Sequence, residues 1–310
     1  MKKTTKKHQR FLEQTIIHLS GTMLNISKDT KRLNALGNKK YISKRKQRQV
    51  IVEGANPKFI SNLSQRYKFD NFIMGEGNKL ASTTAKNISE NPFLNSYNPL
   101  IIYGLVGLGK THIIQAFGNE MLKNDSSKKI VYLTTEQFTV EFIDAIQNGT
   151  ASGFSSFYKS VDVLIFDDVQ FLTGKPRTQD YFLHIFDHLY QTNKMIVLSS
   201  DNPPHKLEGI SERLISRFQS GLTVKINAPD FETRVGILKN RADSYMVQIP
   251  DEVLEYIANN ITSSIRELEG CLTSLLVSAA LDLKGISLDL AKAVVNEITT
   301  PLDTDQNIIP

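Results

Sequence analysis

Short apolar runs alternate with longer segments of helical periodicity over the middle of the chain. The runs are too short for helices and have little polar alternation, which is typical of strands buried on both faces. The predicted strands are 99–103, 130–134, 162–167, 195–199 and 222–226. Helical segments are predicted between them, at 78–90, 110–123, 135–148 and 177–192. This alternation predicts an α/β fold with a mostly parallel sheet covered by helices on both faces.

The pattern changes after Pro229, where helical periodicity continues with no strand between the helices. Pro250 directly precedes one helix and Ser264 can cap another, since proline favours the first turn and serine the N-cap. The predicted helices are 230–243, 251–260, 264–282 and 287–298. We therefore expect a small all-α domain over 229–299, with residues 300–310 as a tail.

The beginning of the chain has a different composition. Residues 11–23 favour one amphipathic helix, although Gly21 weakens the pattern. Residues 27–65 are rich in Lys, Asn, Ser and Gln and have few large apolar groups, which favours a flexible linker. We expect a basic, mostly disordered arm over 1–65, followed by the α/β domain over 66–228.

The net charge of +5 over 310 residues hides an asymmetry. Residues 1–60 hold 15 Lys and Arg against three acids, a net charge of +12, so the other 250 residues carry −7. Basic arms commonly bind polyanions. A solvated tail that keeps a protein in solution has the same composition, and charge alone does not separate the two.

Composition also limits where the protein acts. A single cysteine, Cys271, excludes an internal disulfide framework and fits a reducing compartment. No stretch approaches the roughly 20 apolar residues that a membrane span needs. Glu13, Gln14 and His18 interrupt the apolar segment that a signal peptide would need. We expect a cytoplasmic protein.

Residues 104–111 read Gly-Leu-Val-Gly-Leu-Gly-Lys-Thr, a complete phosphate-binding loop between a predicted strand and a predicted helix. Gly107 and Gly109 let backbone N–H groups point at phosphate oxygens. Lys110 supplies a positive charge to the β- and γ-phosphates, and the Thr111 hydroxyl can ligate Mg²⁺. The loop predicts a nucleoside triphosphate as ligand.

The third predicted strand ends in two acids, Asp167 and Asp168. A strand buried on both faces has no reason to end in adjacent carboxylates unless they meet charge. In nucleotide sites one such acid holds Mg²⁺ and the other polarises the attacking water. We assign Asp167 to the metal and Asp168 to the water, with an ordinary polar strand exit as the alternative.

Further polar residues occupy positions that suit phosphate. The fourth predicted strand ends in Ser200 and Asp201, either of which could sense the γ-phosphate. Arg213 and Arg217 lie one turn apart on a predicted helix, and Arg266 opens a helix of the all-α domain. Arginine suits multi-donor contact with phosphate oxygens, including across a subunit boundary. Salt bridges to neighbouring glutamates are the alternative.

Together these motifs closely resemble the bacterial replication initiator family DnaA over roughly residues 66–299, in order and in spacing. The matching segments are 67–72, 98–100, 107–112, 167–172, 213–218 and 265–270. The segments that begin at Asp167 and Ile265 are the most specific to the family. The resemblance implies an AAA+ module, in which an ATP-binding P-loop core is followed by a helical lid.

By that resemblance, segment 67–78 lines the adenine pocket and Asp201 is the first nucleotide sensor. Arg266 is the lid sensor, and Arg217 is the arginine finger that completes the ATP site of a neighbouring subunit. Arg213 occupies a position associated with assembly. The implied cofactors are ATP and Mg²⁺, with Thr111 and Asp167 at the metal, and the implied assembly is a homo-oligomer in the ATP state.

The family also has an inserted helix pair before the acid strand that grips single-stranded DNA. Ile143, Lys175 and Arg177 stand where that contact would be made. The two cations suit phosphate, while an isoleucine packs on sugar or base.

The sequence departs from the family in several places. Leu105 stands where the family usually has glycine, which is expected to stiffen or reshape the phosphate loop. Ser220 replaces a commonly aromatic residue, and residues 1–60 do not resemble the family's folded N-terminal domain. The chain stops at Pro310, just after the lid, without the helix-turn-helix domain that reads duplex DNA. We expect either a shortened initiator or a fragment of one.

The leading hypothesis is an ATP-binding, self-assembling initiator of chromosomal replication that opens origin DNA. Its weak intrinsic ATPase would act as an off-switch rather than as a metabolic reaction, and the replicative helicase is a further candidate partner. The alternative is a related regulatory or helicase-loader ATPase that acts on another initiator or on the helicase. A third hypothesis is a simple nucleic-acid tether that uses the basic arm at 1–60, which would bind duplex DNA in place of the missing domain.

Overall fold

The computed structural model describes residues 61–91, 97–281 and 285–299. The helix predicted over 11–23, the linker up to residue 60 and the tail lie outside these residues. The chain divides into two compact units, and the larger one includes all described residues up to 275 and those from 286 to 299. Among the described residues, no helix is both long and apolar enough to cross a membrane.

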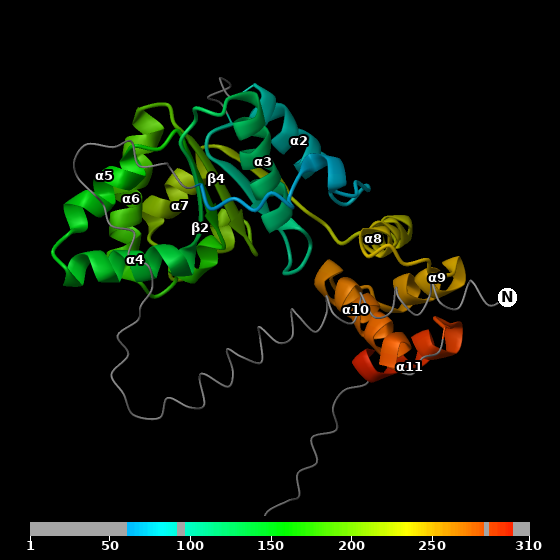
Figure 1. Cartoon of the computed structure of the whole chain (residues 1–310). Coiled ribbons are helices and arrows are strands. Elements are labelled where there is room, and N and C mark those ends of the chain that lie inside the picture. The colour runs from blue at the N-terminus through cyan, green and yellow to red at the C-terminus, as the bar shows by residue number, and fades with distance from the viewer. Residues whose placement is uncertain (1–60, 92–96, 282–284, 300–310) are drawn as a thin grey trace, which may run out of the picture. The chain divides into compact units, whose positions relative to one another are not determined.

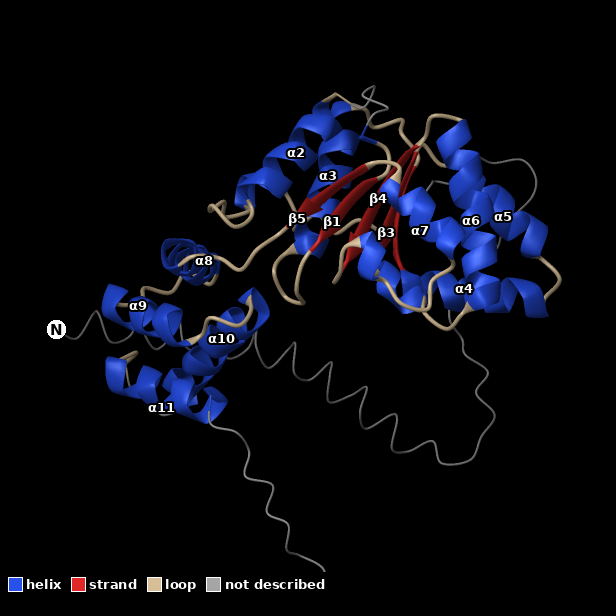
Figure 2. Cartoon of the chain, turned by 180° about the vertical axis from the view of Figure 1, so that it is seen from behind, coloured by secondary structure: helices blue, strands red, loops and turns tan. Residues whose placement is uncertain are grey.

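Five parallel strands form one sheet in the order β2-β3-β4-β1-β5 (Figure 2). The strands are β1 (Leu100–Tyr103), β2 (Ile130–Thr134), β3 (Val163–Asp167), β4 (Met195–Ser200) and β5 (Leu222–Lys225). Thr134 pairs with Asp167 and Tyr103 with Ser200, so the carboxyl ends of these strands lie along one edge. The predicted parallel sheet is confirmed, and each strand agrees with its prediction to within one residue at either end.

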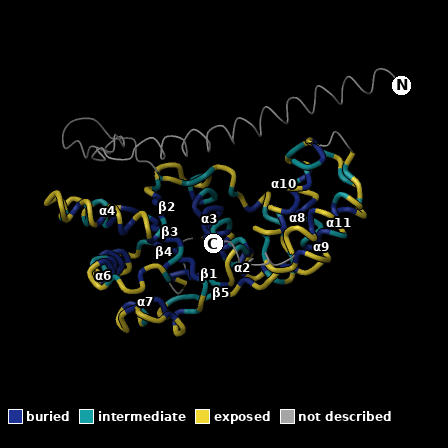
Figure 3. The backbone as a smooth tube through the Cα atoms, turned by 90° about the horizontal axis from the view of Figure 1, so that it is seen from below, coloured by how far each residue is buried: buried dark blue, intermediate teal, exposed yellow. Residues whose placement is uncertain are grey.

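Helices cover both faces of the sheet (Figures 1 and 2). Because successive strand residues point to opposite faces, Leu100 and Ile102 pack into one core cluster and Ile101 into the other. The first cluster is closed by α2 (Lys79–Glu90) and α3 (Lys110–Asn124). The second is closed by α4 (Thr135–Gln147), α5 (Ala151–Lys159), α6 (Pro176–Gln191) and α7 (Glu212–Gln219). The central strands β3 and β4 are correspondingly buried at every residue, whereas the edge strand β5 is partly exposed (Figure 3).

Helix α5 is not among the predicted helices, because Gly153 and several serines lower the helical propensity there, although Phe154, Phe157 and Tyr158 follow helical spacing. It is held by aromatic packing instead. The ring centroid of Phe138 on α4 lies 5.2 Å from that of Phe154 and 5.4 Å from that of Tyr158, both on α5. The Tyr158 hydroxyl also donates to Oε2 of Glu141 at 2.5 Å. Tertiary packing therefore outweighs the weak local propensity of this segment, and α4 and α5 form a helix pair before β3.

Four helices follow the sheet, at α8 (Phe231–Ser244), α9 (Asp251–Asn260), α10 (Ile265–Leu281) and α11 (Leu288–Thr299). Their positions agree with the sequence prediction. The Asp230 side chain caps α8 by accepting the Thr233 N–H at 2.8 Å, and Pro250 directly precedes α9.

The predicted linker extends too far. The carbonyl of Ser61 accepts the Tyr132 N–H of β2 at 2.9 Å, and the N–H of Ser64 donates to Oε1 of Gln115 at 2.9 Å. Leu63 packs against the core cluster that α3 helps to form. Residues 61–64 are thus attached to the α/β domain, and the prediction of a linker up to 65 is wrong for them. Backbone hydrogen bonds fix this segment, and composition does not reveal such bonds.

Candidate nucleotide-binding site

The loop between β1 and α3 turns on two glycines. Gly107 has φ +77° and Gly109 φ +95°, in the left-handed region that a Cβ disfavours. A Cβ on Gly107 would also lie 2.8 Å from Cβ of Ser264. Helix α3 begins at Lys110, so the N–H groups of its first turn face the loop without intrahelical partners. The combination is an anion cradle built from backbone.

Leu105 does not distort this loop. Its side chain is 68% exposed, and its φ is not among the left-handed values of the described residues. Its carbonyl oxygen accepts a hydrogen bond from the Lys110 amino group at 3.1 Å. A leucine therefore fits where the family usually has glycine, because this position needs neither left-handed backbone nor a small side chain.

Lys110 is 5% exposed, and its amino group is held by three oxygens. It donates to the carbonyl of Gly104 at 2.7 Å and to Oδ1 of Asp201 at 2.6 Å, besides the carbonyl of Leu105. One ion pair thereby joins Asp201, which follows β4, to the phosphate loop. Asp201 thus lies beside the loop, where a residue that senses the γ-phosphate has to be.

Asp167 is 2% exposed and is surrounded by hydroxyl donors. Thr111 donates to its Oδ2 at 2.9 Å, the Tyr132 hydroxyl donates to the same oxygen at 2.8 Å, and the Ser199 hydroxyl donates to Oδ1. Burial, followed by the charge of Asp167, raises the pKa of the Tyr132 hydroxyl. Tyr132 thus remains a donor to the carboxylate.

Asp168 lies at the turn after β3 with φ +59°, and its N–H donates to Oγ of Ser199 at 2.8 Å. Burial, and then the neighbouring charge of Asp167, raise the pKa of the Asp168 carboxyl. The side-chain amide of Gln170 donates to Oδ1 of Asp168 at 3.1 Å. A half-buried acid with a raised pKa at the edge of a cleft is suited to polarising water.

These residues surround a cleft of about 840 Å³, a size typical of small-molecule sites. Of the predicted site residues, Gly107, Gly109, Lys110, Thr111, Asp168, Asp201 and Arg266 line it. Asp167 is buried beside the cleft and accepts a hydrogen bond from Thr111, which lines it. The structure therefore brings together all the residues that the sequence assigned to the ATP and the metal.

Aromatic side chains form another wall of the cleft. The ring of His112 makes edge contacts with Tyr67 and Phe72, at centroid distances of 5.0 and 4.9 Å. A ring nitrogen of His112, Nε2, lies 2.9 Å from the carbonyl oxygen of Lys68, and burial lowers the pKa of this histidine. Flat, mostly uncharged surfaces of this kind suit a nucleobase.

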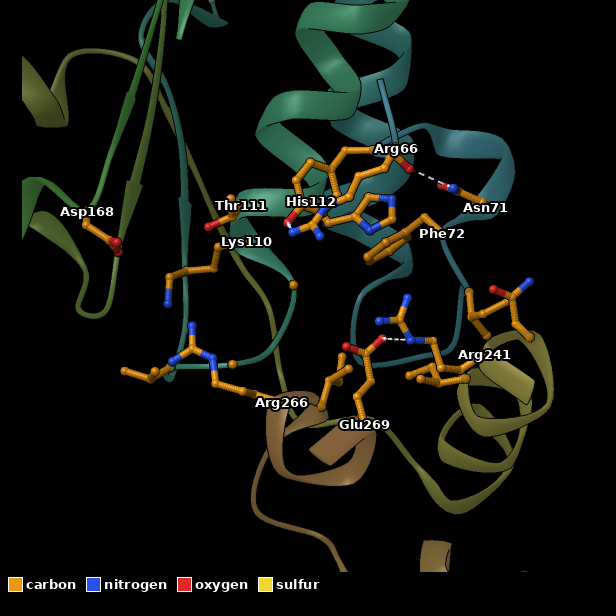
Figure 4. Close-up of a pocket in the computed structure, with 18 of the residues that line it drawn as sticks. Arg66, Asn71, Phe72, Lys110, Thr111, His112, Asp168, Arg241, Arg266 and Glu269 are labelled. Carbon is orange, nitrogen blue, oxygen red and sulfur yellow. Dashed lines mark hydrogen bonds and ion pairs between the residues drawn. The ribbon is translucent and has the colours of Figure 1, made fainter. Parts of the chain in front are cut away.

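Helix α10 contributes the third wall. The N–H of Ile265 donates to the carbonyl of Gly107 at 2.9 Å, which joins the start of α10 to the phosphate loop. Figure 4 shows the side chains of Arg266 and Lys110 directed into the same part of the cleft. Further along, Arg241 of α8 faces Glu269 of α10, with Nε 3.9 Å from Oε1. Lys110, Arg266 and the N-terminus of α3 thus lie together where an anion would bind.

The donor set also fits a magnesium ion. A threonine hydroxyl and a carboxylate are hard oxygen ligands, and Mg²⁺ is usually held by one or two such groups together with phosphates. Over the described residues, no group of three or more His, Cys, Asp and Glu could hold a metal by itself. The site therefore suits a metal that arrives with a phosphate ligand.

Arg217 lies outside the cleft, on α7. Its Nε donates to Oδ1 of Asp187 on α6 at 2.6 Å, and its side chain is 44% exposed. The alternative of a salt bridge is realised in the single chain, though with an aspartate from another helix.

A second, smaller groove of about 390 Å³ lies between α4 and α6. Ile143, 45% exposed, and Arg177 both line it, beside Phe142 and Tyr181. Lys175 is the N-cap residue of α6, two positions before Arg177. Two of the three residues that the resemblance assigned to DNA, Ile143 and Arg177, therefore line one groove with an apolar floor, while Lys175 lies outside its lining.

Residues 63–225 match the family described as Bacterial DnaA ATPase domain, over more than half of the chain. The chain belongs to this family. The expected α/β P-loop core with a helical region after it is thereby confirmed as the DnaA-type AAA+ arrangement.

Individual DnaA proteins are similar to this chain in sequence and in structure. The chromosomal replication initiator protein DnaA of Chlorobaculum tepidum is 47% identical over 247 residues, which cover 80% of this chain and 50% of that protein. Domain III of the Thermotoga maritima DnaA superposes with a TM-score of 0.74 at 38% identity, over 78% of this chain and 100% of that one. The chain spans about half the length of the curated relatives that it matches.

A third relative carries ligands. A replication initiator DnaA bound to AMPPCP and single-stranded DNA superposes with a TM-score of 0.63 at 42% identity. The match covers 69% of this chain and 66% of that one.

Three residues of this DnaA-family site were missed in the sequence. Tyr132, Ser199 and Gln170 all hydrogen-bond to the assigned acids. Gln170 lies within the segment 167–172 that carries the family resemblance, which is the one signal that could have indicated it. Tyr132 lies in the middle of β2 and Ser199 is the next-to-last residue of β4, and neither has such a signal in one sequence.

Proposed function

We propose that this chain is an ATP-binding, self-assembling initiator of chromosomal DNA replication that opens origin DNA and acts in the cytoplasm. The observation that carries the proposal is the single cleft in which a phosphate loop, an acid pair and a lid arginine meet. The family membership supports it, since the relatives described above are chromosomal replication initiators.

ATP with Mg²⁺ is the proposed ligand, and the residues divide the work. Thr111 and Asp167 would hold the metal, while the buried Asp168 would polarise the water that ends the active state. The residues proposed to hold the nucleotide are Gly107, Gly109, Lys110, Thr111, Asp201 and Arg266. Hydrolysis would be slow and would serve as an off-switch.

The proposed active form is a homo-oligomer in which Arg217 reaches the neighbour's nucleotide. Its ion pair with Asp187 is partly exposed, and an exposed pair of this kind contributes little to stability. Exchange of Asp187 for a phosphate is therefore inexpensive in free energy. An arginine presents several donors to a developing phosphate charge, which suits the role.

Single-stranded DNA is the proposed substrate of the assembly, through Ile143, Lys175 and Arg177. The groove lined by Ile143 and Arg177 has an apolar floor for sugar or base and an arginine for phosphate, and Lys175 precedes Arg177 by two positions. The basic arm at 1–60 is a second proposed contact, with duplex DNA, and the replicative helicase is a proposed partner.

The test is ATP-dependent binding of single-stranded DNA by the wild type and by a variant that carries Lys175→Ala and Arg177→Ala. Binding in ATP that the double variant loses supports the initiator. A wild type that binds ATP but no single-stranded DNA leaves the alternative, a regulatory or helicase-loader ATPase.

A further inference from the structure

Gln170 lies between two carboxylates that come from different strand ends. Its amide nitrogen, Nε2, donates to Oδ1 of Asp168 at 3.1 Å and to Oδ2 of Asp201 at 2.9 Å. Its amide oxygen accepts the backbone N–H of Asp201 at 3.3 Å. A single side chain thus contacts the acid after β3 and the acid after β4.

This contact extends to the phosphate loop. The other carboxylate oxygen of Asp201, Oδ1, accepts the amino group of Lys110 at 2.6 Å. A continuous line of polar contacts therefore runs from Lys110 through Asp201 and Gln170 to Asp168. All four residues line the same cleft.

The backbone around Gln170 is fixed. It belongs to the 3-10 helix η3 (Val169–Leu172), which follows Asp168 directly. Val169 and Leu172 are both 0% exposed and pack into the core cluster on that face of the sheet. The backbone that carries the amide is therefore fixed. The hydrogen bonds to Asp168 and Asp201 then orient its two N–H donors before any ligand binds.

The amide also solves an electrostatic problem. Two carboxylates that approach one another repel, and a neutral group with two N–H donors can satisfy both at once. A glutamate of the same shape has no such donors at neutral pH and would add a third negative charge. Gln170 donates to one carboxylate oxygen of Asp168, Oδ1, and this leaves the other oxygen, Oδ2, for a water molecule.

We propose that Gln170 is a positioning residue that couples the phosphate end of the cleft to the water-polarising acid. Its amide fixes Asp168 relative to Asp201, so that the arrangement of Lys110 and Asp201 on the phosphates sets the orientation of the Asp168 carboxylate. The inference rests on the proposed ATP site and deepens it. Because Gln170 acts through Asp168 and Asp201, its removal is expected to slow hydrolysis more than it weakens nucleotide binding.

Two variants separate the roles of the amide. Gln170→Glu keeps the shape and the acceptor for the Asp201 N–H but removes both donors, whereas Gln170→Ala removes the whole amide. The matched control is Gln191→Glu, an exposed glutamine at the end of α6 outside the cleft. Thermal unfolding of each variant checks that the fold is retained.

The first measurement gives two constants for each variant of the chain, the Kd for ATP and the rate of hydrolysis at saturating ATP. Gln170→Ala should bind ATP within about threefold of the wild type, whereas the added negative charge of Gln170→Glu should weaken ATP binding further. At saturating ATP both variants should hydrolyse it about 10- to 100-fold more slowly, as removal of an outer-shell partner typically does. Gln191→Glu should match the wild type in both. Wild-type hydrolysis by both Gln170 variants at saturating ATP would overturn the proposal.

The second measurement needs no nucleotide. Crystal structures of the free wild type, Gln170→Ala and Gln191→Glu give the positions of the Asp168 and Asp201 carboxylates. Because the Gln170 amide donates to both carboxylates, they should be displaced from one another in Gln170→Ala and stay in place in Gln191→Glu.

The two measurements distinguish the failures. If the wild type binds ATP but never hydrolyses it, the off-switch of the proposed function fails, and the crystal structures alone decide on Gln170. Asp168 and Asp201 carboxylates in the same positions in the wild type and in Gln170→Ala would then overturn the positioning role, and displaced ones would support it.

Discussion

The amino group of Lys110 lies 2.6 Å from Oδ1 of Asp201, across the cleft edge between α3 and β4. The lysine is almost completely buried and also contacts two loop carbonyls, so its charge is balanced by protein groups in the free chain. An incoming phosphate has to compete with this carboxylate for the lysine. Nucleotide binding therefore changes the contacts of Asp201, which Gln170 connects by hydrogen bonds to Asp168.

Lys110→Ala should weaken ATP binding by about 100-fold, or about 2.7 kcal/mol, because it removes the buried cation that meets the phosphates. Isothermal titration calorimetry with ATP and Mg²⁺ measures the change. Lys86→Ala, an exposed lysine on α2, is the matched control and should bind ATP as the wild type does. A Lys110→Ala variant within about threefold of the wild type would contradict the assigned role.

Leu105→Gly should leave the affinity for ATP within about twofold, although it restores the residue that is usual in the family. The reason is that the Leu105 side chain is exposed and its backbone does not need glycine. Gly107→Ala in the same loop should weaken binding strongly, since its φ is +77° and a Cβ would meet Ser264. Equal effects of the two changes, measured by the same titration, would show that the loop geometry is wrong.

Asp168→Asn should stabilise the fold at neutral pH. The pKa of this carboxyl is raised by burial and by Asp167, so the folded state binds its proton more readily than the unfolded state. Ionised Asp168 therefore disfavours the fold above its folded pKa, and this cost disappears below the unfolded value of about 3.9. Asparagine tolerates the φ of +59° and can still accept from Gln170.

Urea unfolding at several pH values measures this effect. The variant should have the higher free energy of unfolding at pH 7, and the difference from the wild type should shrink as the pH falls through the pKa of Asp168. A variant that is less stable than the wild type at pH 7 would be evidence against the buried, repelled carboxylate.

Phe138→Ala should lower the free energy of unfolding by about 3–5 kcal/mol, the usual cost of removing a buried phenylalanine. Phe138 is 0% exposed and its ring contacts those of Phe154, Tyr158, Phe166 and Phe182. Val140→Ala, on the same helix but 47% exposed, should cost less than about 1 kcal/mol. Similar urea midpoints for the two variants would contradict the packing of α4 and α5.

Much of the fold could be predicted because its strands are short apolar runs and its helices are periodic. Helix α9 (Asp251–Asn260) agrees with its prediction at both ends, since Pro250 marks its start. Helix α5 could not be predicted in this way. Its stability comes from Phe154 and Tyr158 against rings that lie elsewhere in the chain. The attachment of residues 61–64 rests on hydrogen bonds of their backbone to Tyr132 and Gln115 and on the packing of Leu63, and these partners lie far away in the sequence.

The same division applies to the site. Lys110, Thr111 and Asp167 were found because the chemistry of phosphate and magnesium requires those residue types at those positions. Gln170 and Tyr132 were not, because a glutamine or tyrosine acquires its role only from the partner that folding places beside it. Sequence thus indicates the groups that would meet the ligand, and the structure adds the groups that orient them.

The most direct test of the initiator proposal is the fluorescence anisotropy of a labelled single-stranded oligonucleotide titrated with the full chain in ATP, in ADP and without nucleotide. The account predicts tight binding in ATP alone. It also predicts loss of about tenfold or more in affinity when Lys175→Ala and Arg177→Ala are combined, since each phosphate contact contributes to binding. A variant with Lys86→Ala and Lys129→Ala, which removes two exposed cations outside the groove, should bind as the wild type does. Equal binding in ATP and ADP, or equal loss in the two double variants, would contradict the claim that this chain is an ATP-switched initiator.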